Sequence, residues 1–386
     1  MKTFLKTTIF SICLFSLISC NANSQKPKES DLAMTKIVSQ PTNKQAIKVA
    51  LLLDTSNSMD GLIDQAKAQL WELVNELSYV KCDDSKPNLQ IALYEYGNDR
   101  LNSDEGYIRQ VLSFSNDLDE ISKQLFSLTT NGGEEYCGHV IKTSLNQLNW
   151  ESNADDLKLI FIAGNEPFTQ GKISYTEATK LANTKDVTIN TIFCGDYEQG
   201  ISTSWKDGAD LTHGTYMAIN HNQATTYVAS PYDDKIMQLN HKLNKTYIAY
   251  GSFGSQKMAL QAEQDKNAKG YSEANAVNRT VSKSSHLYKN GSWDLVDAEE
   301  KETFNYDDLK DKDLPKELQG KSKEDIKIYI SKKREERTTV QEEIQQLNEL
   351  RRLYIMSQQK ENNSSLESAM VNAIKIQAKQ KNYKWE

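Results

Sequence analysis

The sequence lacks the local patterns that mark zinc enzymes, and it has few hydrophobic residues. Its five histidines show no H-x-x-x-H or H-E-x-x-H spacing, and its five cysteines form no C-x-x-C pair, so no zinc site is predicted. Hydrophobic residues make up 38% of the 386 residues, and the mean hydropathy is -0.66. Beyond the first twenty positions, these values exclude a protein with several membrane-spanning helices.

An excess of basic charge is also absent. The chain has 46 Lys and Arg against 53 Asp and Glu, a formal net charge of -7, whereas a general nucleic-acid binder needs a concentrated basic face. There is no G-x-S-x-G motif, and the glycines and lysine of residues 164–172 do not have the spacing of a phosphate-binding loop. We therefore predict no nucleic-acid partner, no nucleotide and no enzymatic activity.

Residues 1–19 are predicted to be an export signal, because a basic start precedes a short apolar run. Residues 17–20 read LISC, which resembles the lipobox of bacterial lipoproteins. The resemblance implies that Cys20 carries the lipid, and Asn21 in place of Asp favours the outer membrane. The alternatives are an uncleaved anchor and a plain signal followed by a coincidental cysteine. We expect a lipid-anchored protein of the bacterial cell envelope.

The rest of the chain divides into three segments. Residues 20–45 are polar and aperiodic, which predicts a flexible tether. Residues 46–228 alternate apolar runs with amphipathic stretches, which predicts an α/β domain with a doubly wound, mostly parallel six-stranded sheet. The predicted strands cover residues 47–54, 90–96, 108–114, 157–163, 187–194 and 214–219.

Residues 229–386 form a mainly helical C-terminal region in this prediction. Helices are expected at 231–244 and 256–284, a turn with a strand at 285–297, and one long helix at about 321–359. An imperfect heptad stripe in the long helix favours packing within the chain over a self-associating coiled coil. A solvated stalk, a partner-binding arm and a clamp on the sheet domain all fit this region.

Asp54 ends the first predicted strand and is followed by Ser56 and Ser58, giving the motif D-x-S-x-S. At this spacing one carboxylate and two hydroxyls can converge on an octahedral cation, which suits Mg²⁺ or Mn²⁺. The same residue types also form turns and helix caps. The position of the motif is therefore important, because ligand sites in doubly wound folds lie at the carboxyl ends of the strands.

In this position the motif resembles the metal-ion-dependent adhesion site of the von Willebrand factor type A (vWA) family, over about residues 46–221. The resemblance implies a Rossmann-like fold and a bound Mg²⁺ or Mn²⁺. It also implies recognition of a protein partner, whose carboxylate often completes the coordination of the ion, and it implies no catalysis.

Two other loops depart from the family pattern. Gly133 is followed by acidic residues where the family has Thr, and an Asn-Glu pair stands where the family has Asp. The candidate replacement ligands are Glu134 or Glu135, Asn165 or Glu166, and less favourably Thr129 or Thr130. Either the protein itself fills the position of the partner's carboxylate, or metal binding is lost and the acids are solvated. We favour the first, because clustered carboxylates repel one another unless a cation or proton is present.

Three cysteines follow the predicted signal and lipid site. Cys137 comes after the second loop and Cys194 ends the fifth strand, so both are expected near the same edge of the sheet. A Cys137–Cys194 disulfide is possible in an oxidising compartment. The alternative is three reduced, buried thiols, with Cys82 as the third.

We therefore expect a cell-envelope lipoprotein whose vWA domain binds a protein partner through a modified metal site. One alternative is a metal-independent envelope scaffold or assembly protein. A less favoured alternative is a metal-dependent hydrolase, in which the ion activates water.

Overall fold

The computed structural model describes residues 45–82, 85–150, 153–220, 222, 227–358 and 366–385. The predicted export signal, Cys20 and nearly all of the predicted tether lie outside these ranges. Within them, no helix combines the length and apolar character needed to cross a lipid bilayer.

A six-stranded sheet forms the centre of the fold, in the order β4-β3-β1-β5-β6-β7. All neighbouring pairs are parallel except β3 and β4, which run antiparallel. The strands are β1 (Ala46–Asp54), β3 (Asn88–Tyr96), β4 (Ile108–Ser115), β5 (Leu157–Gly164), β6 (Thr188–Cys194) and β7 (Tyr216–Ile219). The predicted doubly wound, mostly parallel sheet is confirmed.

Strand β1 lies at the middle of the sheet because its sequence suits burial on both faces. All nine of its residues are buried, as expected for a central parallel strand. Its side chains alternate between two cores, with Leu51 and Leu53 in one and Ala50 and Leu52 in the other. The pairing of Asp54 with Tyr96 brings the ends of β1 and β3 together.

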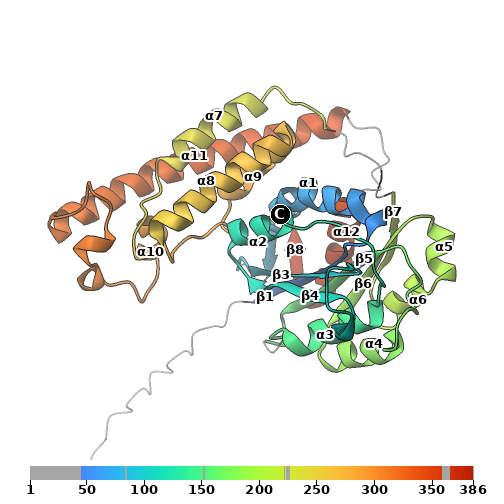
Figure 1. The fold of residues 1–386 in the computed structure, drawn as a ribbon. Coiled ribbons are helices and arrows are strands. Elements are labelled where there is room, and N and C mark those ends of the chain that lie inside the picture. The colour runs from blue at the N-terminus through green and yellow to red at the C-terminus, as the bar shows by residue number, and fades with distance from the viewer. Residues whose placement is uncertain are drawn as a thin grey trace, which may run out of the picture. The chain divides into compact units, whose positions relative to one another are not determined.

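Helices cover both faces of the sheet (Figure 1). One face packs against α1 (Asp60–Leu77), α2 (Leu118–Phe126) and α12 (Leu366–Ala378). The other packs against α3 (Cys137–Gln147), α4 (Tyr175–Thr184) and α6 (Trp205–Asp210), and a short helix α5 (Tyr197–Ser202) precedes α6.

The C-terminal segment returns to the sheet domain. Helix α12 contacts α1 and β5, and β8 (Tyr383–Trp385) pairs antiparallel with the short strand β2 (Val80–Cys82). The Tyr383 hydroxyl donates to the Asp155 carbonyl at 3.0 Å. The last part of the helical region therefore packs on the sheet.

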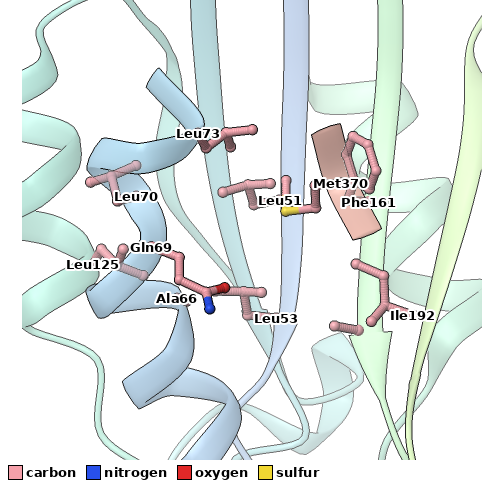
Figure 2. A pocket seen from close by; sticks show the side chains of 11 residues that line it. Leu51, Leu53, Ala66, Gln69, Leu70, Leu73, Leu125, Phe161, Ile192 and Met370 are labelled. Carbon is pink, nitrogen blue, oxygen red and sulfur yellow. The ribbon is translucent and has the colours of Figure 1, made fainter. Parts of the chain in front are cut away.

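A small apolar cavity of about 30 Å³ lies on the α12 side of the sheet. Figure 2 shows Leu70 and Leu73 of α1, Leu51 of β1 and Met370 of α12 around it. Its lining is almost wholly apolar, so it is a packing gap between α1, α12 and the sheet.

The remaining helices form what we call the helical arm: α7 (Asp233–Asn244), α8 (Gly254–Tyr271), α9 (Glu273–Lys283), α10 (Leu295–Glu299) and α11 (Lys323–Gln358). The long helix predicted at about 321–359 is α11, which lies beside α7 and α9 (Figure 1). The arm lies between β7 and α12 in the sequence.

Two details of the arm differ from the prediction. The helix expected at 256–284 is broken at Ser272, which has extended backbone angles and whose hydroxyl accepts from the Asn275 main-chain N–H at 3.1 Å. The strand expected within 285–297 is wrong, because Asp294 caps the start of α10 and makes only an isolated bridge with Ala249. In both places a polar side chain starts a helix.

The heptad stripe of α11 packs within the chain. Ile326, Ile330 and Ile344 are buried, as the favoured interpretation predicts. Arg337, which interrupts the stripe, is buried and forms salt bridges with Asp294 at 2.7 Å and with Asp297 at 2.9 Å. Arg337 is therefore paired with two acids inside the arm, and it does not interrupt a hydrophobic coiled-coil interface on the surface.

Buried polar contacts fix the arm to the sheet domain. Arg279 of α9 forms a salt bridge with Asp119 of α2 at 2.8 Å and lies over the ring of Trp71 of α1 at 4.8 Å. The Asn75 side chain of α1 donates to the Asn278 carbonyl of α9 at 3.0 Å. Helix α1, which starts beside the D-x-S-x-S motif, is therefore also a docking surface for the arm.

Candidate metal centre

The D-x-S-x-S motif lies where β1 ends, at the carboxyl edge of the sheet. Asp54 is the last residue of β1 and is fully buried. One of its carboxylate oxygens, Oδ1, accepts from the Ser56 main-chain N–H at 2.7 Å. The other, Oδ2, is out of contact with solvent and accepts no hydrogen bond within the described part of the chain.

Two further predicted residues lie beside Ser56. The Ser56 and Ser58 hydroxyl oxygens are 3.2 Å apart. The Asn165 amide, from the loop after β5, donates to Ser58 Oγ at 3.2 Å. This leaves Asn165 Oδ1 buried and without a hydrogen-bond donor among the described residues. The first and third loops therefore present oxygens at one place.

Glu135 supplies the second buried carboxylate. It lies in the loop before α3, where its main-chain N–H donates to the Gln170 side chain at 3.1 Å. The side chain is 5% exposed, and its Oε2 is buried without a donor in the described ranges. A Cβ atom at Gly97 would lie 2.8 Å from both Asp54 Oδ1 and Glu135 Cγ, so the two acids flank the same glycine.

Their surroundings disfavour the ionised form of both acids. Burial raises the pKa of Asp54, and the negative charge of Glu135 raises it further. Burial also raises the pKa of Glu135, and the charge of Glu166 acts in the same direction. Two buried carboxylates without a basic partner are costly in free energy unless a proton or a cation balances them.

The other residues predicted as metal ligands are not part of the buried pair of Asp54 and Glu135. Glu134 is exposed and accepts from Gln170 Nε2 at 3.2 Å. Glu166 is also exposed, and its main-chain carbonyl accepts from the Trp205 indole at 2.8 Å. Thr130 donates to Asp60, and Thr129 is exposed. The structure thus gathers Asp54, Ser56, Ser58, Glu135 and Asn165.

Sequence reasoning missed the residues at the end of β3 and directly after it. Gly97 has a φ of 77° and lies against both acids, while the Asn98 side chain donates to the Thr129 carbonyl at 3.0 Å. The Tyr96 hydroxyl donates to the Ala163 carbonyl at 2.9 Å. Their position after the strand next to β1 is the signal that would have found them.

The donor set suits a hard cation. Among the described residues, no three His, Cys, Asp or Glu side chains gather as a metal-binding group. Any ion here must therefore combine the Asp54 and Glu135 carboxylates with the Ser and Asn oxygens. An all-oxygen set of this kind fits Mg²⁺ or Mn²⁺ and does not fit zinc.

The possible disulfide is not formed in this structure. Cys82, Cys137 and Cys194 are all free and buried. Cys137 belongs to the core under α3, whereas Cys194 belongs to the core on the α1 side. The two thiols share an edge of the sheet but lie on opposite faces of it, which sequence position alone does not reveal.

Comparison with known proteins agrees with this architecture. Residues 48–209 match the model of the von Willebrand factor type A domain. Comparison with curated protein sequences finds no match.

Three solved structures resemble part of the chain. BatB from Bacteroides thetaiotaomicron, a conserved hypothetical protein, is 16% identical, with 45% of this chain and 90% of that chain covered and a TM-score of 0.34. An aerotolerance-related membrane protein from Bacteroides fragilis is 16% identical, covering 46% and 93%, with a TM-score of 0.32. The SpRpn10 VWA domain is 12% identical, covering 45% and 88%, with a TM-score of 0.33.

The family match spans the strands that carry the candidate ligands, from β1 through β6. It agrees with the order of the sheet and with the D-x-S-x-S motif at the end of the central strand. Residues 48–209 therefore form a von Willebrand factor type A domain.

Proposed function

We propose that the carboxyl edge of the sheet binds Mg²⁺ or Mn²⁺ and that the vWA domain recognises a protein partner there. The observation that carries the proposal is the pair of buried acids, Asp54 and Glu135, each with an oxygen that accepts no hydrogen bond within the described chain. A cation would satisfy both oxygens at once. Domains of this family are generally interaction modules rather than enzymes.

Each residue has a distinct part in the proposed site. Asp54 and Glu135 supply negative charge, while Ser56 and Ser58 supply hydroxyl oxygens. Asn165 Oδ1 supplies a neutral oxygen. The Asn165 side-chain N–H donates a hydrogen bond to Ser58, which holds the amide group in place. A bound divalent ion would supply a positive centre that an oxygen of the partner can approach.

The loops that hold these residues are tied to one another. The Thr55 carbonyl accepts from the Asn131 main-chain N–H at 2.9 Å and from Asn98 Nδ2 at 3.4 Å. Gln170 bonds to both Glu134 and Glu135. These bonds hold the donor atoms in place before an ion binds, which lowers the entropic cost of binding.

We also propose that the protein is anchored in the bacterial cell envelope by a lipid on Cys20. The support is the LISC sequence at residues 17–20 behind a short apolar run. The lipid would hold the domain near a membrane, so the partner is expected in the envelope. Metabolic labelling with a fatty-acid analogue tests this, and a Cys20→Ser variant must lose the label.

Calorimetric titration of the full chain with Mg²⁺ and Mn²⁺ tests the metal site. Wild-type protein is expected to bind one ion, and Asp54→Ala is expected to weaken binding at least about tenfold, because even the loss of a residue that only orients a metal ligand typically costs about 10- to 100-fold. Asp99→Ala is the matched control, since Asp99 is an exposed acid in a neighbouring loop, and it should retain most of the affinity. Absence of binding by the wild-type chain would refute the metal site.

A further inference from the structure

Exposed acids surround the candidate metal centre. We call Asp60, Asp99, Glu134 and Glu166 the acidic rim; all four are exposed. Asp60 begins α1, and the other three lie in loops at the carboxyl edge. Asp60 accepts a hydrogen bond from Thr130. No salt bridge within the described ranges joins any of the four to a basic residue.

Contacts place these acids close to the buried pair. Gln170 bonds to Glu134 and also to the main chain of Glu135. Glu166 directly follows Asn165, whose amide reaches Ser58. A Cβ atom at Gly132, in the loop that carries Glu135, would lie 3.5 Å from Asp99 Oδ2. The exposed rim therefore borders the buried centre.

The buried pair changes the charge that a partner meets. Asp54 and Glu135 together carry the two negative charges that cancel a divalent ion, so a filled centre attracts anions little. The rim remains negative around it. Arg100 and Lys172 are exposed basic residues of the same loops, and they only partly offset the rim. A carboxylate of a partner would meet a neutral centre inside a negative border.

We propose that this edge binds a basic, lysine- or arginine-rich segment of a protein partner. This inference rests on the proposed function, because the ion must cancel the charge of the buried acids. The negative charge of the acidic rim then determines which partner binds. Complementary charge at a rim sets specificity and association rate. Phosphate-bearing partners, such as nucleic acids and anionic lipids, are repelled by the same charge.

A peptide-binding experiment tests the proposal. The probe is a short labelled peptide of alternating Lys and Ser, compared with its Glu and Ser counterpart, at low ionic strength with saturating Mg²⁺. The rim variant carries Asp99→Asn, Glu134→Gln and Glu166→Gln. The matched control carries Asp308→Asn, Glu335→Gln and Glu342→Gln, which remove three exposed acids of the arm region.

The rim variant is expected to bind the lysine peptide about tenfold more weakly, which corresponds to a few surface charge pairs. The control should stay within about twofold of the wild-type affinity. Equal loss in both variants, or no loss in either, overturns the proposal, because binding then follows net charge alone or lies elsewhere. Mg²⁺-dependent binding of the glutamate peptide also overturns it, and would show recognition of a carboxylate at the metal site.

A separate Mn²⁺ titration distinguishes failure of this inference from failure of the proposed function. The rim variant should still bind Mn²⁺, because Asp54 and Glu135 are unchanged. A modest loss of affinity is expected from the missing negative charge of Glu166 and the altered Glu134–Gln170 bond, so the peptides are compared at saturating ion concentration. If wild-type protein binds Mn²⁺ but the peptides do not discriminate between rim and control, only the basic-partner inference fails. If wild-type protein binds no Mn²⁺, the proposed metal site fails as well.

Discussion

Buried acids occur both at the metal centre and at the docking surface of the arm, but their charges are balanced differently. Where the arm docks, the buried Asp119 of α2 forms a salt bridge with Arg279 of α9 at 2.8 Å. Arg279 also pairs at 2.6 Å with the partly buried Asp265 of α8, and Lys283 pairs with the same carboxylate at 2.9 Å. Burial alone would raise the pKa of Asp265, yet the charges of Lys283 and Arg279 hold it below its ordinary value. At the candidate metal centre, no salt bridge among the described residues involves Asp54 or Glu135, and burial raises the pKa of both.

The difference distinguishes the paired charges of the arm from the unpaired acids of the candidate metal centre. A carboxylate that the chain neutralises with its own arginine or lysine serves docking, because the paired charges are complete within the fold. A buried carboxylate pair without that compensation costs free energy unless something from outside balances it. On the proposed function, a bound cation would supply this balance at the candidate metal centre.

The largest predicted effect comes from breaking the balanced cluster. Arg279→Met should lower the free energy of unfolding by about 3–5 kcal/mol, because it leaves the buried Asp119 without a basic partner and removes one of the two cations that pair with Asp265. Urea denaturation followed by circular dichroism measures this change. Arg100→Met, at an exposed arginine, is the control and should change stability by less than about 0.5 kcal/mol. Equal, small effects of both substitutions would contradict the structural role of the cluster.

A smaller effect is expected at the glycine between the two unbalanced acids. Gly97→Ala should cost about 2–3 kcal/mol, because alanine is strained at a φ of 77° and its Cβ would crowd Asp54 and Glu135. Gly320→Ala is the matched control: its φ is 71°, but no atom lies within 4 Å of the added Cβ. That variant should cost only about 1 kcal/mol.

Chemical denaturation of both glycine variants, with and without Mg²⁺, gives the comparison. The extra loss at Gly97 isolates the crowding of the acids from the backbone strain that both positions share. If the two variants lose the same stability and Gly97→Ala still binds Mg²⁺ normally, the close approach of the acids is not important.

The smallest effect is a pH dependence of stability in metal-free protein. Because the pKa values of Asp54 and Glu135 are raised on folding, the folded state binds more protons than the unfolded state above the ordinary carboxyl pKa of about 4. Stability should therefore increase as the pH falls from about 7 to about 5, by on the order of 1 kcal/mol from this pair.

Urea midpoints at several pH values measure this dependence. The Asp54→Asn, Glu135→Gln double variant should lack the increase, and saturating Mg²⁺ should suppress it in the wild-type protein, because the ion binds the ionised acids. Lowered pKa values act in the opposite direction, so Asp265 loses its contribution only below its ordinary pKa. Identical pH profiles for wild-type and double variant would contradict the coupling of the two acids.

Much of the sheet domain could be predicted from local patterns. The aliphatic run of β1 and the amphipathic period of α1 are readable residue by residue, because burial on two faces or on one face leaves a direct signature in the sequence. The position of Asp54 at the strand end follows from the same run. The helical arm was less predictable, because the break at Ser272 and the helix start at Asp294 depend on single capping side chains.

Contacts between residues that are distant in sequence determine the features that local sequence patterns could not predict. Glu134 and Glu135 are adjacent and chemically alike, yet only Glu135 is buried beside Asp54, because the loop is held by Gln170 and by the space at Gly97. Cys137 and Cys194 come to one edge but to opposite faces.

The amino-acid sequence by itself determines the strands, their mostly parallel order and the hydroxyl-rich loop after β1. These features depend on neighbouring residues and on the spacing of hydrophobic residues along the chain. The choice of the second carboxylate, the pairing of Arg279 across helices and the return of α12 to the sheet were decided by tertiary packing. These features depend on which residues, distant in sequence, become buried together. A charged side chain buried there must be balanced by an opposite charge or a hydrogen bond from another part of the fold.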